Sequence, residues 1–292
     1  SHVDAHLDST LDAGILAREA AMSPHHFHRV FHAHFGLTVG SYITWRRLQR
    51  ACLLLTQSSR SVLEIALSVG YGSAQALAKA MQRELGLTPT AVRLGQPVRW
   101  PEWLARQRMP EMPISPTDGR SMLRPRWHLL PALTVLAASG QGMRHGHMTD
   151  AVQQGFGRLI PALQEAALMP RVSRCMSWLV DASQGPDDPD CRMLTGALFG
   201  YDPHTGRGQP EQAVMTLSAG LQWVPLPAGS HAVFMHLGPY TGLADLWTAI
   251  YRHWVPMTGY PLRDAPSFDL YLDDPRTTAP EQLRTALYLP VA

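Results

Sequence analysis

Cysteine, lysine and long apolar runs are all scarce in this 292-residue sequence. The three cysteines, Cys52, Cys175 and Cys191, are odd in number and lack the spacing of a zinc site, so neither a disulfide framework nor a cysteine metal centre is expected. No apolar run is long enough to cross a bilayer and no signal peptide is recognisable, which predicts a cytoplasmic protein without a membrane partner. The 45% hydrophobic and 16% charged residues argue against a disordered chain, and the length predicts two domains.

Charge is distributed unevenly along the chain, although the formal net charge is only +2. Residues 1–100 contain ten Lys or Arg and six Asp or Glu (net +4), whereas the remainder contains fifteen and seventeen (net −2). Lys79 is the only lysine, so arginines would make most contacts to a phosphate backbone. The surplus fits DNA binding but is too small to establish it.

Two stretches of the basic part predict a helix, a tight turn and a second helix that begins at a polar cap. In the first stretch, Ser23-Pro24 supplies an N-cap and a proline at the first helical position. Apolar residues at helical spacing predict a buried face there, and they are Phe27, Val30, Phe31 and Phe35. Polar residues fall largely on the other side, and they are His25, His26, His28, Arg29 and His32.

The second stretch has Gly70 and Gly72 in its turn and Ser73 as the cap. Its second helix is expected to bury Leu77, Ala80, Met81 and Leu85, and to direct Ala74, Gln75, Ala78 and Lys79 outward. Two such units joined by one helix would read two segments of a DNA groove.

Residues 8–93 resemble the AraC/XylS class of transcription regulators, and the most specific motif residues are Ile65-Ala66, Gly70-Tyr71, Gly86-Leu87-Thr88-Pro89 and Arg93. The resemblance implies an all-α domain with two helix-turn-helix units whose second helices enter the major groove of double-stranded DNA. The positions it implies for DNA contact are His25, His28 and Arg29 in the first unit, and Ala74, Gln75 and Lys79, beside Ser73, in the second. Lys79 stands where the family usually has Arg, so the second unit is expected to discriminate less between sequences.

A helix is predicted over Val39–Leu55, between the two units, and it carries Arg46, Arg47 and Arg50 near one another. We expect at least one of them, Arg46 first, to contact a phosphate, with a solvated helix face as the alternative. His25, His28 and His32 have a spacing that could also hold a transition metal, but no Cys or carboxylate lies nearby in sequence to complete the site. DNA contact is the favoured interpretation, and no metal or cofactor is expected.

Prolines recur between Gln96 and Met122 and predict a linker. The expected domains are therefore a DNA-binding domain over residues 1–95, a Pro-rich linker over 96–121 and a second domain over 122–292.

The second domain contains a weak internal repeat, which predicts an α+β fold built from a duplicated strand-helix-strand-strand unit. The first copy spans residues 127–201 and the second spans 221–291. Two such units would place their helices on one face of a shared sheet, and the seam between the copies is a usual place for a ligand.

This half resembles the GyrI-like effector-binding domain, which is also called the SHS2-type or BmrR-like ligand domain. The strongest residues are Pro227-Ala228-Gly229, His236-Leu237-Gly238-Pro239-Tyr240, Trp254, Phe268 to Pro275 and Leu289-Pro290. The resemblance implies an aromatic-lined cleft, often for lipophilic cations, with a buried acid at Asp269 where the family normally has Glu. Cleft aromatics carry over onto Tyr240 and Tyr271, and pattern alone adds Trp178, Trp247 and Trp254.

Asp269 is unusual on physical grounds as well, because it alternates with Phe268, Leu270 and Leu272 in an apolar strand. A carboxylate on an enclosed face needs a partner, and a bound cation or aromatic dipoles would supply one. The alternative is an exposed aspartate on the wet face of the strand. For Trp247 and Trp254 the alternative is a place in the core.

Taken together, the sequence predicts a transcription regulator that senses a small lipophilic molecule, with cations as an expected class, and that contacts RNA polymerase. The alternatives are a GyrI-like small-molecule hydrolase that carries a DNA-binding domain and a purely architectural DNA-binding protein. No nucleophile elbow, catalytic triad order or metal motif supports an enzyme, so a non-enzymatic role is favoured.

Overall fold

The computed structural model describes residue 7 and residues 13–100, 123–144, 147–181, 187–214 and 220–292. The greater part of the expected linker, residues 101–121, lies outside these ranges. By its internal contacts the chain divides into two compact units. Unit 1 comprises Ser1–Ala20 and Phe35–Ser115, and unit 2 comprises Ala21–His34 and Pro116–Ala292. The expected domain boundaries stay a prediction.

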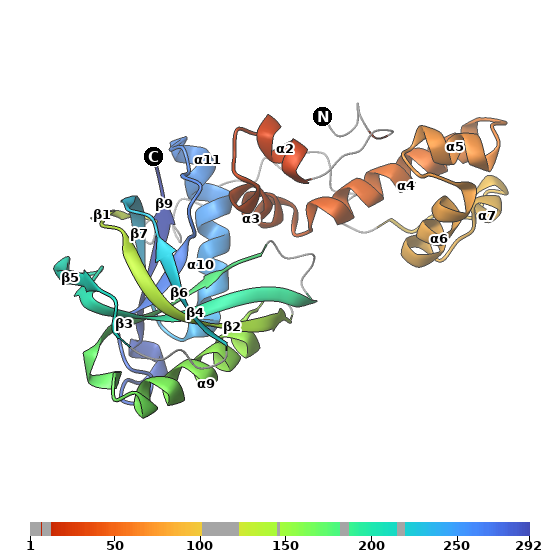
Figure 1. The fold of residues 1–292 in the computed structure, drawn as a ribbon. Helices are drawn as coiled ribbons and strands as arrows, with labels where there is room; N and C mark the ends of the chain where they lie inside the picture. Colours follow the sequence, from red (N-terminus) through yellow and green to blue (C-terminus); the bar gives the residue numbers. More distant parts are fainter. Residues whose placement is uncertain (1–6, 8–12, 101–122, 145–146, 182–186, 215–219) are drawn as a thin grey trace. The chain divides into compact units, whose positions relative to one another are not determined.

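Unit 1 is helical in its described residues (Figure 1). Its helices are α2 (Ala13–Glu19), α4 (Val39–Gln57), α5 (Val62–Ser68), α6 (Ala74–Leu85) and α7 (Pro89–Arg93). Polar caps start four of them: Thr38, Ser61, Ser73 and Thr88 each accept a hydrogen bond from a backbone N–H three residues later. A single core joins α4 to α7 through residues such as Leu48, Ile65, Leu77 and Met81.

The turn between α5 and α6 depends on Gly70. Its φ of +84° lies in the left-handed region, and a Cβ at this position would meet the carbonyl oxygen of Leu7 and lie 2.7 Å from Cζ of Arg47. The prediction for α6 is confirmed for Leu77, Ala80 and Met81, which are buried, and for Gln75 and Lys79, which are exposed. Leu85, which was expected to be buried, and Ala74 and Ala78, which were expected to face outward, are half-buried.

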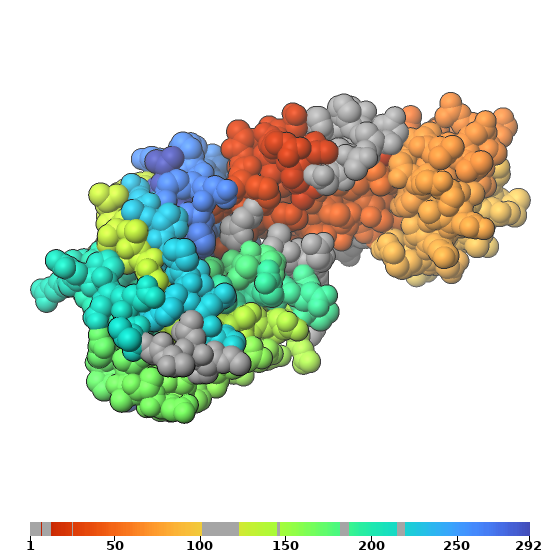
Figure 2. All heavy atoms as spheres, in the orientation of Figure 1, coloured from red at the N-terminus to blue at the C-terminus, as the bar shows by residue number. Residues whose placement is uncertain are grey.

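Unit 2 is organised around an antiparallel sheet with the strand order β1-β7-β9-β8-β3-β4-β2-β6, in which β5 pairs with β4. The strands from β4 to β7, coloured teal to cyan, contribute one surface of this unit (Figure 2). The strands are β1 (Arg126–Leu130), β2 (Leu133–Met143), β3 (Val172–Leu179), β4 (Asp188–Asp202), β5 (Arg207–Glu211), β6 (Leu221–Leu226), β7 (Gly229–Leu237), β8 (Phe268–Tyr271) and β9 (Arg284–Pro290).

Two helices cover one face of this sheet. Helix α9 (Thr149–Glu165) buries Leu159 and Leu163 against residues of β2 and β4, and it runs along β2 in Figure 1. Helix α10 (Leu243–Ala249) buries Leu246 and Trp247 against residues of β7 and β9. It continues through a π-helical turn, η3 (Ile250–Trp254), into α11 (Val255–Thr258). The predicted multidomain architecture, with an all-α part followed by an α+β part of two similar halves, is confirmed.

The opposite face of the sheet holds a separate apolar core. Phe268 and Leu270 of β8 lie there, together with Trp178 of β3 and Tyr288 of β9. Because side chains alternate along a strand, Asp269 and Tyr271 point to the face that α9 and α10 cover.

Helix α3 (Pro24–Phe35) also belongs to unit 2 apart from its last residue. Phe31 is buried and Phe27 and Val30 are half-buried, as the sequence predicts. Two expectations are wrong. Phe35 is 40% exposed, although its ring lies 5.2 Å from that of Tyr42, and His26 is fully buried rather than outward-facing.

Candidate functional site

The seam between the two halves of unit 2 lies over β3 and β8. One row of paired residues crosses the sheet there, from Phe234 beneath α10 to Ala138 beneath α9, and its members are Phe234, Leu287, Asp269, Ser177, Thr195 and Ala138. Asp269 and Ser177 therefore occupy the middle of the helix-covered face. The strand alternation brings Cys175 and Tyr271 to the same face, two pairs further along.

Asp269 is a buried carboxyl group, with 6% of its surface exposed. The indole Nε1 of Trp247 donates a hydrogen bond to its Oδ1 at 2.8 Å. Burial raises the pKa of Asp269 from its ordinary 3.8 to about 6, and the Trp247 hydrogen bond and the positive charge of Arg29 hold the pKa below the value that burial alone would give. Asp269 is thus ionised at neutral pH in surroundings that favour a cationic partner.

Aromatic rings line this position on several sides. The ring of Tyr271 lies 5.1 Å from that of Tyr240 and 5.8 Å from that of Phe156, which α9 contributes. The hydroxyl groups of Tyr271 and Ser177 are 2.7 Å apart. The rings of Trp247 and Tyr251 stack with their centroids 5.7 Å apart. We call Asp269, Trp247, Tyr251, Tyr271 and Tyr240 the Asp269 site.

A residue of helix α3 lies at the Asp269 site. Cζ of the Arg29 guanidinium lies 4.5 Å from the ring centroid of Trp247 and 4.9 Å from that of Tyr251. Both distances are within the range of cation–π attraction. Unit 2 therefore already holds one cation over these two rings, supplied by its own chain.

His26 holds the same helix against the same surface. Its Nδ1 is 3.1 Å from the Tyr251 hydroxyl oxygen, and its Nε2 is 2.9 Å from the carbonyl oxygen of Arg263. The Tyr251 hydroxyl in turn lies 2.8 Å from Oγ of Ser267. Burial lowers the pKa of His26 to about 4, so the imidazole is neutral at physiological pH.

The predicted ligand residues divide into two groups. Asp269, Tyr271, Tyr240 and Trp247 come together, linked by the contacts above. Trp178 follows Ser177 in β3 and so lies in the core of the opposite face, and Trp254 lies further along the helix, with its ring stacked on that of Tyr260. Trp178 is on the opposite face because side chains alternate along a strand. Trp254 is separated from Asp269 because it follows Trp247 by two helical turns.

Several residues of the site were absent from the sequence prediction. Tyr251 follows Trp247 by four positions and could have been found from helical spacing. Ser177 and Phe156 become visible only when the strand register and the position of α9 are known. Arg29 and His26 carry no signal for this role, because more than 200 residues separate them from the rings that they contact.

The predicted DNA-contact residues of α6 lie at and near its N-terminus. Oγ of Ser73 accepts a hydrogen bond from the N–H of Ala76, Ala74 is half-buried, and Gln75 and Lys79 are exposed. In the other predicted reading helix, α3, His28 and Arg29 are half-buried, and the side chain of His25 lies outside the described residues. Arg46 is half-buried on α4.

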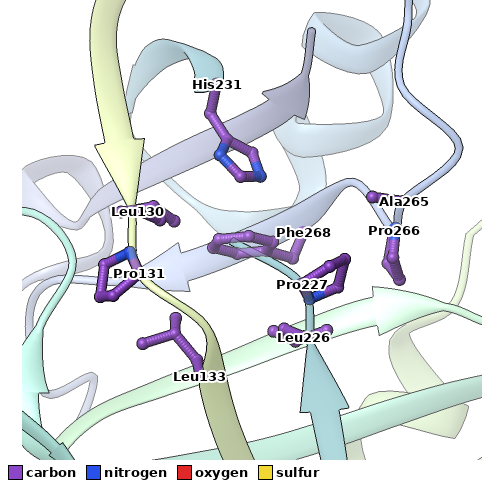
Figure 3. A pocket seen from close by; sticks show the side chains of 9 residues that line it. All are labelled: Leu130, Pro131, Leu133, Leu226, Pro227, His231, Ala265, Pro266 and Phe268. Atoms are coloured by element: carbon purple, nitrogen blue, oxygen red, sulfur yellow. The ribbon is translucent and has the colours of Figure 1, made fainter. Parts of the chain in front are cut away.

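A small pocket opens on the other side of the sheet, where His231 faces apolar residues (Figure 3). Nδ1 of His231 is 2.9 Å from the carbonyl oxygen of Gly229, and burial lowers the pKa of this histidine to about 4. The remaining lining residues are Leu130, Pro131, Leu133, Leu226, Pro227, Ala265, Pro266 and Phe268. This pocket has no carboxylate and belongs to the face opposite Asp269.

Two features missing from the described ranges bear on other functions. No group of three or more His, Cys, Asp or Glu side chains gathers there as a metal site would require. None of the helices in the same ranges combines the length and hydrophobicity needed to span a membrane.

Comparisons with known proteins match both parts of the chain. A helix-turn-helix domain family matches residues 16–95, and the family described as GyrI-like small molecule binding domain matches residues 125–292. The right origin-binding protein of Escherichia coli K12 is 24% identical over 302 aligned residues, covering 99% of this chain and 95% of the relative. The transcriptional regulator Rob of Salmonella typhimurium is 23% identical over 297 residues, with the same coverage. The regulatory protein SoxS of Salmonella typhimurium is 32% identical over 91 residues, which are 31% of this chain and 85% of that protein.

Proposed function

Because this chain belongs to the family of GyrI-like small-molecule-binding proteins and is an AraC-family DNA-binding transcription regulator, we propose that its Asp269 site binds a lipophilic cation and thereby controls DNA binding. The single observation that carries the proposal is a buried carboxylate surrounded by aromatic rings, two of which already hold a guanidinium at 4.5 and 4.9 Å.

The chemistry of Asp269 favours a positive ligand. A buried carboxylate loses much of its hydration, which is why its pKa rises to about 6. One hydrogen bond from Trp247 compensates only in part, because a carboxylate can accept several. A cation beside Asp269 would supply the remaining stabilisation, and the aromatic faces would attract the same charge.

The rings also favour an apolar body around that charge. Trp247, Tyr251, Tyr271, Tyr240 and Phe156 offer flat apolar surfaces, and aromatic side chains contribute much of the binding energy in such sites. A ligand that combines a delocalised positive charge with aromatic groups would use both features. Small metal ions and anions would not.

A tryptophan-fluorescence titration tests this proposal. Tetraphenylphosphonium and tetraphenylborate have almost the same shape and opposite charges, so the pair separates charge from size. We expect saturable binding of tetraphenylphosphonium to the wild type, and a loss of at least about tenfold in affinity for Asp269→Asn, which corresponds to roughly 1.4 kcal/mol. Trp247 lies within the site, so its emission should respond directly.

The charge-matched variant Asp264→Asn is the control, because Asp264 is exposed and lies five residues before Asp269. It should bind tetraphenylphosphonium as the wild type does. Equal affinity of the wild type for the phosphonium and the borate, or undiminished cation binding by Asp269→Asn, would rule out Asp269 as the charge partner.

We propose that helices α3 and α6 read two segments of the major groove. His25, His28 and Arg29 would act in the first unit, Ala74, Gln75 and Lys79 with Ser73 in the second, and Arg46 on a phosphate. The exposure of Gln75 and Lys79 supports this assignment. Contact with RNA polymerase remains part of the same proposal.

A catalytic role finds less support than sensing. Among the described residues around Asp269, the candidate nucleophiles are Cys175 and Ser177. Burial raises the pKa of the Cys175 thiol to about 11, which keeps it protonated, and the Ser177 hydroxyl pairs with Tyr271 rather than with a base. We therefore propose that bound molecules leave the site unchanged. Mass spectrometry of tetraphenylphosphonium and of a labile aryl ester after incubation with the protein tests this.

A further inference from the structure

We propose that the Asp269 site holds Arg29 as an internal cation. Helix α3 is then either docked on the rest of unit 2 or free to read DNA. A cationic ligand frees α3 by taking the place of Arg29. The ligand-dependent part of this inference rests on the proposed function, whereas the docked helix does not. The inference also narrows the ligand class to a planar or aryl cation that can stack on Trp247 and Tyr251.

The docked helix uses one continuous face. His26, Arg29, Val30 and Ala33 follow one another at positions i, i+3, i+4 and i+7, which fall on one side of a helix. Ala33 is buried in the cluster that contains Trp247 and Tyr251, and Val30 packs against the same cluster. The contact therefore combines apolar packing with the polar contacts of His26 and Arg29.

The polar contacts of His26 form a consistent chain in the neutral tautomer that carries its proton on Nε2. Nε2–H donates to the carbonyl oxygen of Arg263, and Nδ1 accepts from the Tyr251 hydroxyl, which itself accepts from the hydroxyl of Ser267. Both ring nitrogens of His26 and the hydroxyl groups of Tyr251 and Ser267 therefore have hydrogen-bond partners, although His26 is fully buried. A contact of this kind fixes the position of α3, and with it the position of Arg29 over the rings.

Arg29 is the residue that the two states share. The predicted DNA-reading face of α3 contains His25, His28 and Arg29, and the docked face contains His26, Arg29, Val30 and Ala33. One guanidinium cannot stack on Trp247 and Tyr251 and also contact a base or phosphate. Docking therefore competes with DNA reading by α3 for Arg29.

The same geometry defines the competitor. A guanidinium is planar and delocalised, and it stacks on aromatic faces more readily than a hydrated ammonium ion does. A ligand that displaces it must stack on Trp247 and Tyr251 and must neutralise Asp269. The ligand can shift the equilibrium between docked and undocked α3 only as far as its preference for the undocked state allows. Because DNA prefers the same undocked state, the ligand and DNA each favour the binding of the other.

His26→Ala is the most informative variant, because it weakens docking, leaves Arg29 in place and removes a group that is neutral in the docked state. We expect this variant to bind a selected duplex and tetraphenylphosphonium each roughly two- to thirtyfold more tightly than the wild type, since docking no longer competes. Fluorescence anisotropy measures the first affinity and tryptophan quenching the second. His147→Ala, at an exposed histidine of unit 2, is the matched control and should change neither affinity.

The outcomes separate the two proposals. If tetraphenylphosphonium does not bind the wild type, the proposed ligand class fails, and tighter duplex binding by His26→Ala would still establish the docked helix. If His26→Ala binds the phosphonium no better than the wild type while the wild type binds it, the internal-cation inference is overturned. Unchanged or weaker duplex binding by a His26→Ala protein with wild-type circular dichroism would overturn it as well.

Discussion

At the scale of single residues, Asp269 shows how a binding site opposes stability. Its pKa is raised to about 6 in the folded protein, against 3.8 ordinarily, so the folded state binds the proton more tightly than the unfolded state does. Stability from this group is fully present below pH 3.8 and is lost as the pH rises through about 6. At neutral pH an ionised Asp269 therefore destabilises the ligand-free fold.

Asp269→Asn should consequently stabilise the ligand-free protein. The asparagine Oδ1 can still accept the Trp247 hydrogen bond, and the buried charge disappears. We expect an increase of about 1–3 kcal/mol in the free energy of unfolding at pH 7.5, which shrinks towards zero near pH 4. Chemical denaturation at both pH values measures this. A destabilised variant at pH 7.5 would mean that the negative charge of Asp269 is already fully compensated.

Cation binding should follow the same ionisation. Arg29 of α3, His236 of β7 and the Trp247 hydrogen bond all act on Asp269, and each favours its ionised form. In the His26→Ala variant, where docking of α3 no longer competes, tetraphenylphosphonium affinity should therefore rise with pH between 5 and 7 and level off above about 7, because a cation prefers the carboxylate. Adding Asp269→Asn to this variant should give a flat profile over the same range, and an equally flat profile for His26→Ala alone would contradict the role of Asp269.

At the scale of elements, the turn before α6 provides a matched pair of glycines. Gly70→Ala places a methyl group against the Leu7 carbonyl oxygen and the Arg47 guanidinium at a positive φ, whereas a Cβ at Gly72 meets no atom within 4 Å. We expect Gly70→Ala to lower the free energy of unfolding of unit 1 by about 1–3 kcal/mol, and Gly72→Ala to change it by less than about 0.5 kcal/mol. Thermal denaturation of both variants checks the difference.

Helix α6 should read bases through its first turn. Gln75→Ala should weaken binding to a selected duplex by roughly 1–3 kcal/mol if the side chain pairs with a base. Gln82→Ala, two turns further along the same helix, should have little effect. Equal losses for the two variants, measured by fluorescence anisotropy at fixed salt, would contradict the placement of α6.

Helix α3 should be released by mild acid. Docked His26 has a pKa of about 4 against an ordinary 6.5, so protonation of His26 favours the undocked helix between these pH values. The positive charge of Arg29 lowers the pKa of docked His26 further, whereas the negative charge of Asp264 raises it. Protonation of Asp269 removes the partner of Arg29 over a similar range. Duplex affinity of the wild type should rise from pH 7.5 to 5.5 more steeply than that of His26→Ala; parallel profiles would contradict release.

Sequence reasoning succeeded wherever local pattern decides the structure. The cap at Ser73, the burial of Leu77, Ala80 and Met81 in α6 and the alternation around Asp269 are all local, and each predicted feature is found. The position of Trp178 was wrong because one residue of register changes the face of a sheet. Helix α3 illustrates the deeper limit, since its faces depend on partners more than 200 residues away.

At the scale of the whole molecule, helix α3 is the element on which the proposed DNA reading and the proposed ligand binding meet. Helix α3 completes the first helix-turn-helix unit in the sequence and packs within unit 2 in the structure. The proposed coupling would need no further relay, because ligand and DNA would act on the same arginine. The coupling free energy between ligand and DNA equals the part of the docking free energy of α3 that the bound ligand removes.

The most direct test is duplex binding by the wild type at pH 7.5 with and without saturating tetraphenylphosphonium, with tetraphenylborate in parallel. The account predicts that the phosphonium tightens duplex binding by roughly two- to thirtyfold, that the borate does not, and that Asp269→Asn shows no response to either. Bound phosphonium that leaves duplex affinity unchanged, or that lowers it, would contradict the account.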